Sequence, residues 1–95
     1  MSDTLTLNPS GTEGCTPSPD PWKPSKGGPV TITNSSGFEQ VLHNISPGLL
    51  NPSPGGSITV PTTGWTGTVG NTKGTYSYDD GLGMRGVRSG TIDPS

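Results

Sequence analysis

The sequence predicts an all-β protein, a sandwich or barrel of about seven short strands formed by one domain of 95 residues. Three observations support this fold class. Short stretches alternate apolar and polar residues with a period of two, as half-buried strands do. Turn-forming residues interrupt these stretches roughly every eight to twelve positions. The composition includes 26 serine and threonine residues and no alanine, which favours strands and turns over helices.

The first predicted strand covers residues 4–8, in which Leu5 and Leu7 alternate with polar residues. It ends at an Asn-Pro-Ser-Gly turn. From about residue 8 to residue 26, repeated prolines and glycines predict an irregular connection, with Trp22 packed inward as its anchor. Cys15 lies in this connection and is expected to be exposed. As the only cysteine it cannot form an internal disulfide, so the chain must fold without one.

Residues 29–34 show the clearest strand pattern, with Val30 and Ile32 on one face. The next segment, 38–45, is apolar at positions 38, 41, 42 and 45, a spacing that fits one amphipathic helical turn almost as well as a strand with a bulge. We favour the strand, because glycine and proline bracket the segment and eight residues are too few for a stable helix.

The second half of the chain continues the same pattern. Residues 47–56 form a predicted turn region in which Leu49 and Leu50 cap the core, and residues 57–61 form a strand ended by proline. Three further strands are expected at 64–70, 74–78 and 86–92. Their predicted core residues are Trp65, Val69, one of Tyr76 and Tyr78, Val87 and Ile92.

Composition also excludes several classes of protein. No stretch approaches the roughly 18 to 20 consecutive apolar residues that a transmembrane helix needs. Five lysine and arginine residues spread over the chain, with a formal net charge of −2, cannot neutralise a phosphate backbone, so we expect no nucleic-acid partner. The beginning of the chain has neither the basic nor the apolar region of a signal peptide.

From Gly27 onward, the order of the motifs resembles a cupredoxin domain of the plastocyanin and azurin type. The matching pieces are Lys26-Gly27-Gly28-Pro29-Val30-Thr31-Ile32-Thr33-Asn34, Leu42-His43-Asn44-Ile45, Ser57-Ile58-Thr59-Val60-Pro61, Gly74-Thr75-Tyr76-Ser77-Tyr78 and Gly81-Leu82-Gly83-Met84-Arg85-Gly86. They cover roughly two thirds of the chain. The resemblance implies a Greek-key β-sandwich over residues 1–95 and a periplasmic or extracellular location.

The same resemblance implies where a blue-copper site would lie. The family site takes one histidine from the first motif and a Cys-x-x-His-x-x-x-x-Met run from the final loop. His43 and Met84 occupy the first and last of these positions, but Asp79 and Asp80 follow the tyrosine motif and the chain has no second histidine. The only thiol, that of Cys15, precedes the first matching strand. The resemblance therefore suggests the fold and argues against the copper activity.

Two candidate groups have structural alternatives. The imidazole of His43 could bind a metal or transfer a proton, but a single histidine without neighbouring ligands is better explained by a hydrogen bond to a loop carbonyl. Asp79 and Asp80 could bind calcium, but the D-x-[DN]-x-[DN]-G spacing of a calcium-binding loop is missing. The sequence Asp-Asp-Gly is also common in the turns of β-hairpins. We favour the structural explanation in both cases.

These observations favour a non-enzymatic cupredoxin-like binding or structural module without a functional blue-copper site and without an expected cofactor. No nucleophile motif, zinc-protease motif or phosphate loop supports an enzyme. The alternative is a metal-binding or electron-transfer copper protein with an unconventional ligand set of His43, Met84 and Asp79 or Asp80, or with Cys15 contributed across a dimer.

A third hypothesis is a sugar-binding or adhesive module that uses an aromatic surface. Its candidate rings are Trp22, Trp65, Tyr76 and Tyr78. The partner would be a protein or a glycan, and open sheet edges together with an unpaired thiol are compatible with a monomer or a weak dimer.

Overall fold

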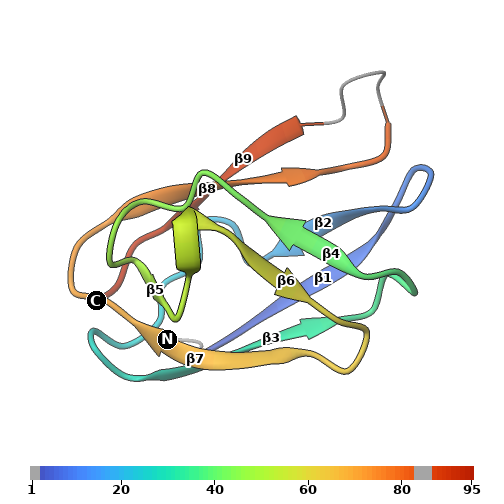
Figure 1. Ribbon diagram of the computed structural model, residues 1–95. Coiled ribbons are helices and arrows are strands. Elements are labelled where there is room, and N and C mark those ends of the chain that lie inside the picture. The colour runs from blue at the N-terminus through green and yellow to red at the C-terminus, as the bar shows by residue number, and fades with distance from the viewer. Residues whose placement is uncertain (1–2, 83–86) are drawn as a thin grey trace.

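The computed structural model describes residues 3–82 and 87–95, and within these ranges the chain contains nine strands and no α-helix (Figure 1). The 3-10 turn η1 (Pro54–Gly56) lies between β5 (Leu50–Asn51) and β6 (Ile58–Val60). The all-β prediction is therefore confirmed. The described residues contain no helix with the length and apolarity that a membrane crossing requires.

Five strands form a curled mixed sheet in the order β2-β1-β3-β7-β5. Its strands are β1 (Thr4–Ser10), β2 (Gly14–Ser18), β3 (Pro29–Asn34), β7 (Trp65–Val69) and β5 (Leu50–Asn51). The pair β1 and β3 is parallel and the other pairs are antiparallel. The predicted alternation holds in this sheet, since Leu5, Leu7, Val30 and Ile32 all point into the core.

The remaining strands pair as β4 (Gln40–Leu42) with β6 (Ile58–Val60) and β8 (Gly74–Asp79) with β9 (Val87–Ile92), both antiparallel. An isolated antiparallel bridge between His43 and Ser77 joins the two pairs. Its backbone hydrogen bonds run from Ser77 N to His43 O at 2.7 Å and from His43 N to Ser77 O at 3.0 Å. The four strands therefore follow one another in the order β6, β4, β8, β9.

The core lies between these two groups of strands. Its largest fully buried side chains include Trp22 and Tyr76, and Trp65 packs against it from a partly buried position. Trp22 is anchored by its backbone, since its N–H donates to Thr91 O at 2.9 Å and its carbonyl accepts from Asp93 N at 2.7 Å. Leu49 and Leu50 are buried as predicted.

The segment 8–26 is more regular than the sequence indicates. β1 continues to Ser10 and β2 occupies residues 14–18, although each strand contains a proline. In a strand, the backbone polar groups of residues two apart point to the same side. Leu7 O accepts a hydrogen bond from Ser35 N, so the nitrogen of Pro9 also faces the β3 side. The pairing with β3 ends at Leu7, so the missing N–H of Pro9 costs no hydrogen bond to β3. Pro17 lies opposite Leu7 in edge strand β2, where its missing N–H costs no sheet hydrogen bond.

Other expectations need correction in the same way. Cys15 is fully buried rather than exposed, because it lies on the inward face of β2 together with Pro17. Both tyrosines of β8 are buried, since residues two apart share one face of a strand. Val87 is 57% exposed and outside the core, because the inward face of β9 carries Gly90 and Ile92.

The segment 38–45 is extended, as we favoured, but its strand is limited to β4. Leu42 and Ile45 are buried, whereas Phe38 and Val41 are each 46% exposed. The apolar spacing that resembled a helical turn thus mixes core residues with surface residues.

Candidate functional site

The residues predicted to form a site lie around the ends of β4 and β8. His43 follows β4 and pairs through its backbone with Ser77, in the middle of β8. Asp79 ends β8 and Asp80 follows it. Met84 lies outside the described residues. The topology therefore brings His43 close to the strand that precedes Asp80 and ends at Asp79, although His43 is far from both aspartates in sequence.

We expected the His43 side chain to form a hydrogen bond to a loop carbonyl, but its Nε2 atom forms none with any described residue. This nitrogen is buried and has no hydrogen-bond partner, whereas the backbone of His43 is fully used by Ser77. The following residue, Asn44, has a φ of 51°, and its Nδ2 donates weakly to Ser77 Oγ at 3.4 Å. The two backbone hydrogen bonds to Ser77 thus fix the position of the His43 backbone, from which the imidazole extends.

Asp79 and Asp80 organise the bend that leaves β8. Asp79 Oδ1 accepts a hydrogen bond from Gly81 N at 2.8 Å, and Asp80 Oδ1 accepts one from Leu82 N at 3.0 Å. Asp80 Oδ2 forms an ion pair with Arg88 Nε at 2.6 Å across the β8–β9 pair. The Leu82 N–H is the main reason that the pKa of Asp80 lies below its ordinary value, and Arg88 acts in the same direction. These contacts are those of a structural bend, which is the explanation we favoured.

Arg88 was not among the residues singled out from the sequence. Its partner carboxylate is nearly buried, with 6% of the side chain exposed, whereas the arginine side chain is 63% exposed. The pairing depends on the register that places Arg88 opposite Tyr78, next to the end of β8. A spacing of eight residues between Asp80 and Arg88 carries no recognisable signal in the sequence itself.

Cys15 lies on β2, which packs against the end of β8. Gly14 allows this approach, because a Cβ at that position would lie 2.2 Å from the backbone carbon of Asp80. Burial raises the pKa of the Cys15 thiol to about 11, and the charges of Asp79 and Asp80 add to the effect. The thiol is therefore held in its neutral form, which is a poor metal ligand.

The four aromatic rings that could have formed a binding platform do not lie on the surface together. Trp22, Tyr76 and Tyr78 are buried, and Trp65 is partly buried. The rings of Tyr76 and Tyr78 are tilted by 40° with centroids 6.0 Å apart, which is a packing contact. The aromatic sugar-binding hypothesis is therefore wrong for these residues.

The described residues contain no group of three or more histidine, cysteine, aspartate or glutamate side chains placed to hold a metal ion. They do contain hollows that the sequence did not indicate, along the segment 45–56. Comparison with known proteins adds no relative, since no protein-family model, no curated protein and no solved structure matches the chain.

Proposed function

We propose that this protein is a non-enzymatic binding or structural module with a cupredoxin-like Greek-key β-sandwich and without a functional blue-copper centre. The observation that carries the proposal is the state of Cys15. A blue-copper site needs a thiolate, and the only thiol of the chain is buried on β2 with its pKa raised to about 11.

The sandwich part of the proposal is supported by how the chain connects its strands. β3 and β7 are neighbours in the five-stranded sheet although β4, β5 and β6 lie between them in sequence. Likewise, the His43–Ser77 bridge joins β4 to β8 across three intervening strands. Connections that pass repeatedly between two groups of strands are typical of Greek-key sandwiches.

The residues present do not fit a type 1 copper site. The bend after β8, where the family has its cysteine and second histidine, carries aspartates instead. Asp80 already accepts hydrogen bonds from Leu82 and Arg88, and binding a metal there would have to displace them. Hard carboxylate oxygens also suit calcium or magnesium better than the soft ligation of a blue site.

A second candidate function rests on one observation, the buried Nε2 of His43 that has no hydrogen-bond partner. An unpartnered buried nitrogen is costly, and a metal or a proton donor bound beside it would lower that cost. This supports the alternative of a metal-binding or electron-transfer protein centred on His43. The further ligands that the sequence offers for it are Asp79 or Asp80 and Met84.

A copper(II) titration of the reduced protein distinguishes these proposals, with visible absorption and melting temperature as readouts. A metal that binds only the folded state raises the melting temperature by mass action. The proposed module gives neither an intense blue band nor a rise in melting temperature. An intense band that disappears in Cys15→Ser would overturn it in favour of a copper–thiolate protein.

The His43→Ala variant tests the second candidate. Stabilisation by copper without colour, lost in His43→Ala, would establish a site centred on His43. Asn44→Gly is the matched control, because Asn44 is exposed, follows His43, makes only a long hydrogen bond to Ser77 and has a positive φ that glycine adopts readily. Stabilisation that survives in His43→Ala would show that the proposed ligand set is wrong.

A further inference from the structure

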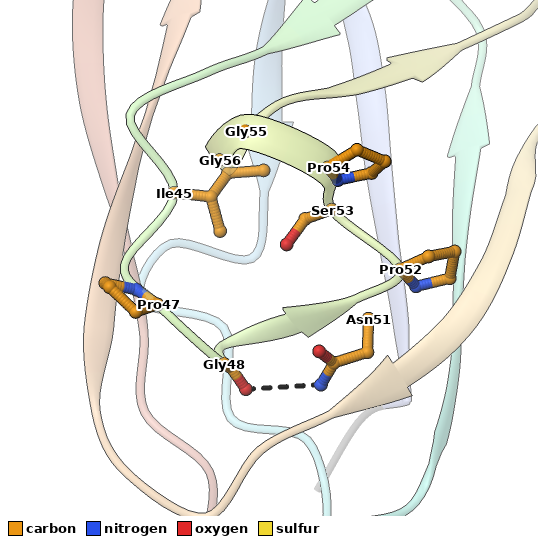
Figure 2. Close-up of a pocket in the computed structure, with 9 residues that line it drawn as sticks. All are labelled: Ile45, Pro47, Gly48, Asn51, Pro52, Ser53, Pro54, Gly55 and Gly56. Atoms are coloured by element: carbon orange, nitrogen blue, oxygen red, sulfur yellow. Dashed lines mark hydrogen bonds between the residues drawn. The ribbon is translucent and has the colours of Figure 1, made fainter.

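The segment from Ile45 to Gly56 closes on itself and surrounds a hollow of about 670 Å³ (Figure 2). Its ends are joined by a hydrogen bond from Ile45 N to Gly56 O at 3.0 Å. Residues of this segment alone line the hollow, and we call it the 45–56 hollow. Compact loops with joined ends are frequently functional, and ligand sites commonly enclose about 300 to 1,000 Å³.

The lining of the 45–56 hollow is uncharged and rich in proline. Pro47, Pro52 and Pro54 border it, and Figure 2 shows these three rings around its edge with the side chains of Ser53 and Ile45 directed toward its middle. Proline rings present flat apolar surfaces and carry no N–H. The hollow therefore offers apolar contact area and few hydrogen-bond donors.

The donors that are present are largely used within the segment. Ser53 Oγ donates to Leu50 O at 2.6 Å, Asn51 Nδ2 donates to Gly48 O at 3.3 Å, and Gly56 N donates to Ser53 O at 3.0 Å. No described residue donates to the carboxamide oxygen of Asn51, and the Ser53 oxygen keeps its lone pairs. A ligand that fits this chemistry combines a flat apolar ring with a hydrogen-bond donor.

A second hollow of about 510 Å³ adjoins the first and shares Pro47 and Gly48 with it. It is lined in part by Lys73, which is exposed and lies within ion-pair distance of no carboxylate of the described residues. The positive charge of Lys73 therefore lies next to the uncharged 45–56 hollow, which offers hydrogen-bond acceptors. This arrangement favours a ligand that carries a negative charge next to its apolar ring.

We propose that the 45–56 hollow binds a hydroxylated aromatic ring that carries a carboxylate, with the ring against the prolines, the hydroxyl donating to Ser53 Oγ or Asn51 Oδ1, and the carboxylate facing Lys73. The ligand is an aromatic acid, either free or as the carboxyl-terminal tyrosine of a peptide. This rests on the proposed function in one respect, because it names the ligand class of a binding module.

The test is a titration of the isotope-labelled full chain with small aromatic probes, followed by backbone amide NMR. We expect 4-hydroxyphenylacetate to shift the amides of Gly48, Asn51, Ser53 and Gly55, with a dissociation constant on the order of 1 mM. Phenylacetate, which lacks the hydroxyl, should bind about two- to tenfold more weakly. The neutral 4-hydroxyphenylacetamide should bind about two- to fivefold more weakly.

Two substitutions assign these differences to residues. Lys73→Gln should abolish the preference for the acid over the amide, whereas Lys23→Gln, which removes the same charge from an exposed residue outside both hollows, should leave that preference unchanged. Ser53→Ala should reduce the preference for the hydroxylated ring. If Ser53→Ala does not fold, as judged from its amide dispersion, the probe series on the unmodified chain still decides the role of the hydroxyl.

The peptide acetyl-Gly-Gly-Tyr distinguishes the two sources of the ligand. Tighter binding of the peptide than of 4-hydroxyphenylacetate points to a carboxyl-terminal tyrosine, and weaker binding points to a free aromatic acid. Absent shifts with every probe, shifts confined to other parts of the chain, or equal effects of Lys73→Gln and Lys23→Gln would overturn the proposal. Its failure is distinct from that of the proposed function, which depends on the copper titration.

Discussion

The carboxylate of Asp80 accepts one hydrogen bond at each of its two oxygens, although its side chain is nearly buried. Leu82 N–H and Arg88 Nε are its specific partners, at 3.0 Å and 2.6 Å. Both favour the charged form, so the pKa of Asp80 lies below its ordinary value in the folded protein. The charge of one side chain is thereby linked to the stability of the bend after β8.

This linkage has a predictable pH dependence. Because the folded-state pKa of Asp80 is lower than the unfolded-state pKa, its contribution to the free energy of unfolding is present above the unfolded-state pKa of about 3.9 and is lost as the pH falls through the folded-state pKa. We expect Asp80→Asn to lower the urea midpoint at about pH 6, and this difference from the unmodified protein to shrink at about pH 2.5.

Glu39→Gln is the control for Asp80→Asn, because Glu39 is also acidic but lies exposed on the surface. It should change the urea midpoint little at either pH. A gap between Asp80→Asn and the unmodified protein that is equally large at both pH values would contradict the linkage.

At the scale of the elements, Asn34 joins the end of β3 to the second group of strands. Its Nδ2 donates to Phe38 O at 2.7 Å and to Val60 O, on β6, at 3.1 Å. Its Oδ1 accepts from Ser36 N at 3.0 Å and from Ser36 Oγ at 2.6 Å. One side chain thus satisfies four polar groups where the chain leaves the five-stranded sheet and approaches β4.

We expect Asn34→Asp to lower the free energy of unfolding by about 2 to 4 kcal/mol, because a carboxylate cannot donate to the two carbonyl oxygens. Asn8→Asp is the matched control. Asn8 is exposed and makes a single long hydrogen bond, to Thr16 O at 3.5 Å, so its replacement should cost less than about 0.5 kcal/mol. Urea denaturation at neutral pH measures the free energy of unfolding of both variants. If Asn34→Asp and Asn8→Asp lowered it by similar amounts, this role for Asn34 would be refuted.

At the scale of the whole molecule, residues distant in sequence depend on one another for burial. Trp22 is held by the backbone of Thr91 and Asp93, and Thr12 N donates to Gly81 O at 2.9 Å. The parallel pair β1 and β3 and the bridge between His43 and Ser77 also join distant segments. A single pair of these strands cannot bury its apolar face without the other strands, so we expect the whole core to form in one step.

We therefore expect the chain to unfold as one domain in a single cooperative transition. Tryptophan fluorescence, which reports Trp22 and Trp65, and far-UV circular dichroism, which reports the strands, should give the same urea midpoint and the same slope. Two separate transitions would show that β8 and β9, or the segment around Trp22, fold independently of the rest.

Much of the fold is predictable from local pattern. Alternation in residues 29–34 identifies β3 and its core residues, because side chains of a strand point to opposite faces in turn. Prolines misled the prediction at β2, since a local pattern does not show that Pro17 would lie on an edge where no N–H is needed. At the candidate site, the sequence identified Asp80 as part of a bend but not Arg88 as its partner.

The amino-acid sequence alone establishes that this protein is built from short strands, that it has one thiol and one histidine, and that Asp79 and Asp80 follow the Tyr76–Tyr78 strand. These are local properties, since periodicity and residue identity do not depend on what lies across the core. Tertiary packing establishes that Cys15 is buried beside those aspartates, that His43 pairs with Ser77, and that the segment 45–56 surrounds a hollow. Each of these depends on strand register and on contacts between residues far apart in sequence, which no local pattern encodes.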